Sequence, residues 1–170
     1  MAEAVIDLVS DESEIKSKNG NLECPVCLQG CVHPAKLPCG HVFCYLCIKG
    51  FANQNKKCAM CRQEVPMDFL EHPNLLERLT LEDVKVFEDG YQWFYEGRNG
   101  WWRYDERANE EIEEAFKAEL PNFELIICGE LYVVDFKSNY QYSKRCPTRK
   151  RAIRRDKIDN VVVKGVAGIR

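Results

Sequence analysis

The sequence lacks any run of about 18 apolar residues, which excludes a transmembrane helix. Its first ten residues lack the basic stretch that opens a secretory signal peptide. The chain also lacks a nucleophile paired with a general base, so we expect no catalytic residue in the strict sense. These absences predict a cytoplasmic and nuclear protein that has no membrane partner.

Cysteine, in contrast, is abundant, with ten in 170 residues. Seven of them and one histidine form four close pairs, and a close pair lets one tight turn supply two zinc ligands. Four pairs therefore predict two zinc ions. A disulfide cluster is the alternative, but it fits poorly because a histidine stands in register and no secretory signal is present. The pairs are Cys24 and Cys27, Cys39 and His41, Cys44 and Cys47, and Cys58 and Cys61.

The order and spacing of these ligands resemble the RING finger, which we place at residues 23–72. The domain is too short to bury a large core, so zinc would supply its stability, on the order of 10 kcal/mol for each ion. The resemblance implies a cross-brace in which the pairs interleave. Zinc 1 would bind Cys24, Cys27, Cys44 and Cys47, and zinc 2 would bind Cys39, His41, Cys58 and Cys61.

A RING finger also implies a partner, the ubiquitin-conjugating enzyme charged with ubiquitin. The implied contacts are Val26 in the first zinc loop, Phe51 on a helix expected at about residues 45–52, and Arg62 after the last ligand. The arginine fork suits a bridge between two proteins, although a solvated arginine is the alternative. Asn53 stands near the slot where many RING fingers have a large apolar residue, so the choice of conjugating enzyme stays open. A RING ligase accelerates transfer by orienting the enzyme's thioester.

Residues 1–22 form an acidic arm, with five acidic and two basic residues in the first 20. We expect the arm to be disordered. Its stretch VIDLVSDESE resembles a SUMO-interaction motif, a peptide that adds a strand to a partner sheet. A solvated tail without a partner is the alternative. The resemblance implies apolar contacts from Val5, Ile6 and Leu8 and acidic contacts from Asp11, Glu12 and Glu14.

Residues 73–86 connect the RING finger to the rest of the chain. We expect one or two helical turns here. If Leu75, Leu76 and Leu79 face inward, this linker packs the two halves together, whereas a flexible tether is the alternative.

Residues 87–160 predict a second domain. Aromatic residues on both sides of Asn99-Gly100 indicate a β-hairpin. Helical spacing follows over residues 106–118, and then come three strands and a last strand at about residues 150–156. We expect a half-wrapped antiparallel sheet that carries one helix. The fold class is therefore α+β, with Trp93 and Trp101 assigned to the core.

The second domain resembles the WWE domain, and the stretch YEGRNGWWRYDER carries the resemblance. The whole chain resembles the RING–WWE ubiquitin ligases that poly(ADP-ribose) directs, sometimes called Iduna-type. Residues 141–170 hold ten basic and two acidic residues, which suits a polyanion, and aromatic side chains offer platforms for adenine. The resemblance implies a ligase that binds the iso-ADP-ribose unit of the polymer, is activated allosterically by it and ubiquitinates poly(ADP-ribosyl)ated proteins.

Eight ligand-binding residues follow from matching family positions. Lys49 lies on the RING helix and would let the ligand bridge the two domains, although a solvated lysine is the alternative. Trp102 suits either the core or the ligand. The terminal segment, residues 161–170, would contribute a lysine to the phosphates. The full set is Lys49, Tyr95, Arg98, Trp102, Tyr132, Gln141, Arg151 and Lys164.

A second function stays open, in which the chain is a non-catalytic zinc-containing binding module for nucleic acid or SUMO. Iduna-type proteins often extend further and recruit tankyrase, a poly(ADP-ribose) polymerase, through downstream motifs that residues 1–170 do not show, as expected for a fragment. The sequence does not identify the protein substrates, the conjugating enzyme, the ubiquitin linkage or the oligomeric state.

Overall fold

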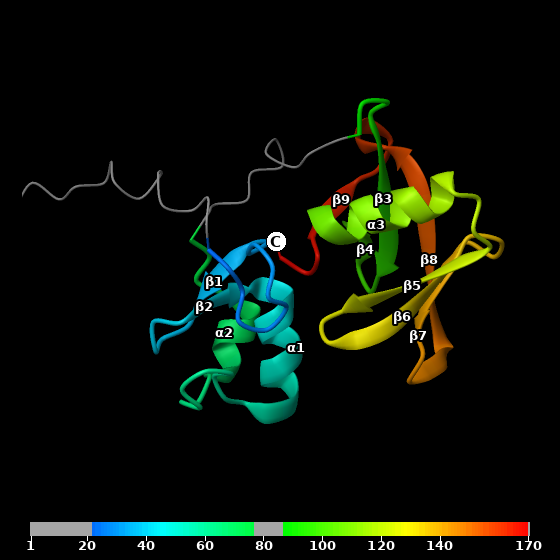
Figure 1. Cartoon of the computed structure of the whole chain (residues 1–170). Helices are drawn as coiled ribbons and strands as arrows, with labels where there is room; N and C mark the ends of the chain where they lie inside the picture. The colour runs from blue at the N-terminus through cyan, green and yellow to red at the C-terminus, as the bar shows by residue number, and fades with distance from the viewer. Residues whose placement is uncertain (1–21, 77–86, 170) are drawn as a thin grey trace, which may run out of the picture.

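A computed structural model describes residues 22–76 and 87–169, which form two lobes (Figure 1). The first lobe holds the zinc-ligand pairs, and the second holds one helix and a large sheet, so the α+β prediction is confirmed. The expected SUMO-interaction motif, with Val5, Ile6 and Leu8, lies outside the described residues. Within those residues, no helix has the length and apolar character to cross a membrane.

The first lobe is built on a short hairpin and two helices. Strand β1 (Pro34–Lys36) pairs antiparallel with β2 (Val42–Cys44), and α1 (Tyr45–Asn55) follows directly. Helix α1 extends three residues beyond the predicted Ala52 and ends where Lys56 adopts the left-handed conformation. The short helix α2 (Met67–Glu71) packs behind it, and Tyr45 of α1 donates a hydrogen bond to the Leu70 carbonyl. This packing holds α1 fixed below the zinc loops.

The linker begins as extended chain at residues 73–76, and the one or two helical turns predicted within residues 73–86 stay a prediction. Leu75 forms a β-bridge with Ala35, and the Leu76 N–H donates to the Pro34 carbonyl at 2.9 Å. The segment pairs beside β1 because an unpaired strand edge offers free backbone groups. Residues 77–86, including Leu79, lie outside the described residues.

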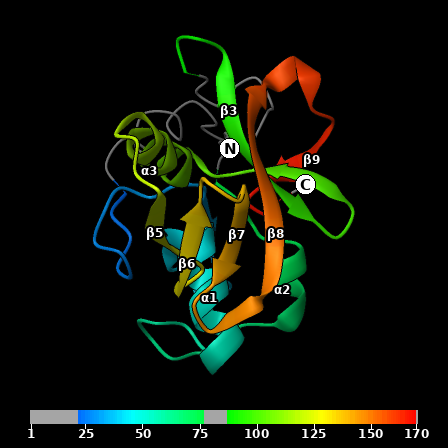
Figure 2. The ribbon, with the colours of Figure 1, turned by 90° about the vertical axis from the view of Figure 1, so that its right-hand side faces the viewer.

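The second lobe is one sheet in the order β5-β6-β7-β8-β3-β4-β9, with α3 (Glu106–Lys117) over one face (Figure 2). Its pairs are antiparallel except β4 with β9, which run parallel. Strand β9 was not predicted, because a four-residue strand that contains a glycine has little periodicity. The strands are β3 (Tyr91–Gly97), β4 (Gly100–Arg103), β5 (Asn122–Ile127), β6 (Glu130–Asp135), β7 (Tyr140–Ser143), β8 (Cys146–Lys157) and β9 (Val163–Val166).

The core of the second lobe lies between α3 and the sheet. Trp93 is buried there as expected, and its indole N–H donates to Glu113 Oε2 at 2.8 Å. Trp101, also assigned to the core, is only half-buried, because its strand position places it on the other face of the sheet. There the Arg154 guanidinium lies 5.3 Å from the centre of the Trp101 ring.

The two lobes pack directly against each other. A Cβ atom added to Gly50 of α1 would lie 2.1 Å from the Cys128 carbonyl oxygen, so only glycine permits this approach. After β9 the chain leaves the second lobe, and Ile169 is buried in the core of the first lobe beside residues such as Leu37 and Ile48. Figure 1 shows this last segment between the lobes. The arrangement places α1 against Cys128, in the turn between β5 and β6.

Candidate functional site

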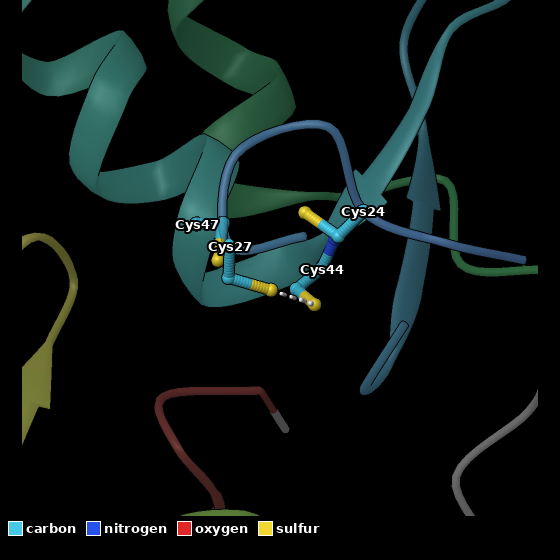
Figure 3. Close-up of side chains that lie close together, drawn as sticks. All are labelled: Cys24, Cys27, Cys44 and Cys47. Atoms are coloured by element: carbon cyan, nitrogen blue, oxygen red, sulfur yellow. Dashed lines mark hydrogen bonds between the residues drawn. The ribbon is translucent and has the colours of Figure 1, made fainter. Parts of the chain in front are cut away.

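The eight predicted zinc ligands form two clusters, and each cluster has the composition that the interleaved arrangement requires. In each, the ligand atoms lie within 4.8 Å of one another. The clusters are Cys24, Cys27, Cys44 and Cys47, drawn in Figure 3, and Cys39, His41, Cys58 and Cys61.

The distances inside the clusters fit tetrahedral zinc. With Zn–S bonds of about 2.3 Å, thiolates at the corners of a tetrahedron are about 3.8 Å apart. The sulfurs of Cys27 and Cys44 are 3.8 Å apart, and His41 Nδ1 lies 3.4 Å from the Cys39 sulfur and 3.7 Å from the Cys58 sulfur. The first cluster therefore suits one zinc ion bound by four thiolates, and the second suits one bound by three thiolates and an imidazole.

Backbone N–H groups aimed at the sulfurs support the same conclusion. Val32 donates to the Cys44 sulfur at 3.2 Å, and Cys44 donates to the Cys24 sulfur at 3.4 Å. In the second cluster, Met60 donates to the Cys58 sulfur at 3.4 Å. Such hydrogen bonds favour the thiolate, which is the form that binds metal. The zinc loops are thus folded to hold two zinc ions, and these are the cofactors of the chain.

The residues assigned to the conjugating enzyme lie on the zinc loops and on α1. Val26 is 40% exposed and Arg62 is exposed, whereas Phe51 is half-buried on α1. Leu28 and Met60, which were not among the predicted residues, are also 72% and 55% exposed on the two zinc loops. Large apolar side chains on zinc loops are a signal that was available in the sequence, because such loops have no core to fill.

A pocket of about 420 Å³ lies between the two lobes, within the usual size range for ligand sites. The first lobe contributes Leu46, Lys49 and Asn53 from α1, and the second lobe contributes residues of the sheet, of the start of α3 and of the last segment. Seven of the eight predicted ligand residues line it: Lys49, Tyr95, Arg98, Trp102, Tyr132, Gln141 and Arg151.

Lys164 is the exception and does not line the pocket. Its side chain lies beside Gly100 at the hairpin turn, where a Cβ atom on that glycine would be 3.3 Å from Lys164 Cε. In its place, the neighbouring Ala167 and Gly168 line the pocket. The lysine side chain therefore lies at the hairpin turn and outside the pocket.

The wall of the pocket is largely aromatic. Its charged residues are the cations Lys49, Arg98 and Arg151 and one acid, Asp105, whose carboxylate caps α3. Burial raises the pKa of Tyr95 and of Tyr132, so both phenols stay protonated. Lys49 Nζ lies 5.1 Å from the centre of the Tyr45 ring, which holds the amine at the pocket. Arg151 is exposed on β8 across the opening. This combination of stacking surface and cations suits a ligand that has both rings and phosphates.

Tyr104 and Cys128 are among the pocket residues that the sequence did not predict. The Tyr104 hydroxyl donates to Gln141 Oε1 at 2.7 Å, and both side chains are buried. This bond fixes the amide, so that its NH₂ group is the end left to donate to a ligand. Cys128 lines the pocket too, and burial raises the pKa of its thiol to about 11. No local pattern pairs residues 37 positions apart, so the sequence carried no signal for the Tyr104–Gln141 bond.

A zinc finger of the C3HC4 (RING finger) type matches residues 20–67, and the WWE domain matches residues 91–155. E3 ubiquitin-protein ligase RNF146 of Homo sapiens and of Mus musculus are each 52% identical over 148 residues, which cover 87% of this chain and 41% of theirs. E3 ubiquitin-protein ligase rnf146 of Salmo salar is 52% identical over 152 residues, covering 87% of this chain and 42% of its own.

The chain thus spans less than half the length of the curated relatives that it matches. Within that span, both domain matches agree with the two lobes, and the ligand pairs agree with the two zinc clusters. The chain therefore belongs to the RING–WWE family of the RNF146 type.

Proposed function

We propose that this chain is a RING-type ubiquitin ligase whose conjugating-enzyme surface is switched on by poly(ADP-ribose). The observation that carries the proposal is the pocket between the lobes, to which the RING helix contributes Lys49 and the WWE sheet contributes Tyr95, Tyr132 and Arg151. A ligand in this pocket contacts both domains at once. The names of the RNF146 relatives, which are ubiquitin-protein ligases, support the activity.

The chain supplies no group for covalent ubiquitin chemistry under this proposal. The conjugating enzyme carries ubiquitin as a thioester, and the ligase binds and orients it. Val26 and Leu28 offer an apolar surface on the first zinc loop, and Arg62, which follows the second-cluster ligand Cys61, offers a forked donor. The zinc ions hold these loops in shape and take no part in the transfer step.

In this proposal the ligand binds one arrangement of the two domains more tightly than the others. The iso-ADP-ribose unit carries phosphates and adenine, which match Arg151 and Lys49 at the edge and the aromatic wall inside. Contacts to Lys49 form only when α1 lies against the sheet, so the ligand favours that arrangement over any in which the domains separate. Poly(ADP-ribosyl)ated proteins would then serve both as activators and as substrates.

Self-ubiquitination with a panel of conjugating enzymes tests the ligase activity, and Arg62→Ala should abolish most of it. Binding of iso-ADP-ribose, measured by calorimetry against single-stranded RNA of equal charge, tests the ligand. A clear preference for iso-ADP-ribose that is lost in Arg151→Ala supports the proposal. Equal affinity for both, with no ubiquitination by any enzyme, would favour a nucleic-acid binding module.

A further inference from the structure

Arg107 belongs to the WWE lobe but reaches into the first zinc loop of the RING lobe. It lies in the first turn of α3, and its Nη2 donates to the Gly30 carbonyl oxygen at 2.8 Å. Its Nη1 lies 3.5 Å from the sulfur of Cys27, a zinc ligand. One guanidinium therefore contacts both the backbone of the loop and a metal ligand from the other domain.

The chemistry of the two acceptors suits this fork. Cys27 binds zinc as a thiolate, and a hydrogen bond to a thiolate from a permanent cation is charge-assisted. Arginine stays protonated and offers parallel donors in a fixed plane, so one side chain can hold two acceptors in register. Groups that hydrogen-bond to metal ligands in this way orient those ligands and tune the affinity for the metal.

Both ends of the contact are held in place by other bonds. On the helix side, the Asp105 carboxylate caps α3 by accepting from the Ala108 N–H at 2.9 Å, and Ala108 is buried. On the loop side, the Leu28 N–H donates to the Cys24 carbonyl at 2.8 Å. Arg107 is half-buried between these ends, so the contact is part of the domain junction and not a swinging surface side chain.

We propose that Arg107 is a positioning residue of the first zinc site, so that this site is completed across the boundary between the two domains. The WWE domain then does more than bind its ligand, because it also holds the Cys24–Cys31 loop in shape. That loop carries the exposed Val26 and Leu28, and its shape sets their position. The part of the inference that concerns the conjugating enzyme rests on the proposed function, whereas the part that concerns zinc does not.

Metal release from the intact chain tests the proposal. Cobalt-substituted protein distinguishes the four-thiolate site from the site with histidine by absorption, and a chelator in excess measures the release from each. We expect Arg107→Ala to accelerate release from the four-thiolate site by about 10- to 100-fold. Release from the second site, which contains His41, should be unchanged and serves as the internal control for global unfolding.

Two further variants sharpen the result. Arg145→Ala removes an exposed arginine that pairs with Glu130 at the start of β6 and should leave both release rates unchanged. Arg107→Lys keeps the charge but loses the fork, and we expect a release rate between those of the wild type and Arg107→Ala. If Arg107→Ala releases metal from the four-thiolate site at the wild-type rate, or accelerates both sites equally, the proposal is wrong.

A binding measurement connects the site to the partner. Arg107→Ala should also weaken binding of the conjugating enzyme, while Arg145→Ala should not. If release accelerates as expected but the wild-type chain binds no conjugating enzyme, the proposed ligase function fails and the composite zinc site stands. Unchanged release together with normal binding of the conjugating enzyme would overturn only the role of Arg107.

Discussion

Glu113 shows how a carboxylate is kept charged inside the WWE core. Its side chain is 3% exposed, and it accepts hydrogen bonds from the Trp93 indole and from two nitrogens of Arg155. Burial alone would raise the pKa of Glu113, but these bonds and the charge of Arg155 outweigh burial, and the pKa is lowered. The residue thus ties α3 to β3 and β8 through one buried ion pair.

This lowered pKa predicts a specific dependence of stability on pH. A group with a lowered pKa in the folded state stabilises the fold above its unfolded pKa, which is about 4.3 for glutamate. The stabilisation is lost as the pH falls through the folded pKa. We expect Glu113→Gln to lower the free energy of unfolding at pH 7 by about 1.5–3 kcal/mol.

Urea unfolding of both proteins between pH 7 and about pH 3.5, below the unfolded pKa of glutamate, measures this effect. The difference between wild type and Glu113→Gln should shrink toward low pH, and taking the difference cancels the loss of zinc that both proteins share. A difference that stays constant across this range would show that the charge of Glu113 does not stabilise the fold.

Removal of the Tyr104 hydroxyl should weaken ligand binding in the pocket. Tyr104→Phe keeps the ring and removes the donor to Gln141 Oε1, which is buried, so the amide loses the bond that orients it. An unsatisfied buried acceptor costs about 1–3 kcal/mol. We expect the affinity for iso-ADP-ribose to fall about tenfold in calorimetry.

A matched control for this variant is Tyr140→Phe, since Tyr140 is 42% exposed on β7 and does not line the pocket. It should bind iso-ADP-ribose with the wild-type affinity. Equal affinities for wild type, Tyr104→Phe and Tyr140→Phe would mean that the amide of Gln141 does not recognise the ligand.

At the scale of elements, helix α1 belongs to the RING finger and also contacts the WWE lobe. One end follows the zinc ligand Cys44, and Lys49 and Gly50 in its middle meet the WWE lobe. Gly50 is a point of very close approach between the domains, because the backbone of Cys128 occupies the space that a side chain would need. Under the proposed function, a change in the spacing of the domains reaches the conjugating-enzyme surface through this helix.

Gly50→Ala should push α1 away from Cys128 and so widen the spacing between the two domains. Alanine favours the helix by about 1 kcal/mol over glycine, so the helix itself should not be weakened. The new methyl group meets backbone, which does not yield easily. We expect weaker binding of iso-ADP-ribose and a smaller response of the ligase to it.

Self-ubiquitination without ligand is the second measurement for this variant, because it separates a change in basal activity from a change in the response to the ligand. Gln54→Ala is the matched helix control, since Gln54 is exposed on the same helix and does not line the pocket. If Gly50→Ala responds to iso-ADP-ribose as fully as Gln54→Ala does, close packing of α1 on the WWE lobe does not matter for the switch.

Local patterns explain why so much of the fold was predictable. The zinc ligands stand in turns that are only a few residues long, and the Asn99-Gly100 hairpin and helix α3 each follow a short-range pattern. Strand β9 and the extended start of the linker at Leu75 were not predicted. Each is stabilised by a strand far away in the sequence, which no local pattern encodes.

At the scale of the whole molecule, the chain is two small domains that complete each other's sites. Seven of the eight residues that the family resemblance implied line one pocket, and Lys164 stands apart because the last segment turns at Gly165–Gly168. Neither periodicity nor spacing predicts contacts such as Arg107 with Cys27, because they depend on how the domains dock. The site is therefore a property of the assembled pair.

The most direct test of this account is self-ubiquitination by the wild type and by Lys49→Ala, each with and without iso-ADP-ribose. We predict at least about tenfold stimulation of the wild type. Lys49→Ala should keep the basal activity and lose most of the stimulation, whereas Lys137→Ala, an exposed lysine on the far turn of the sheet, should respond as the wild type does. Wild-type activity that is equal with and without iso-ADP-ribose would contradict the account.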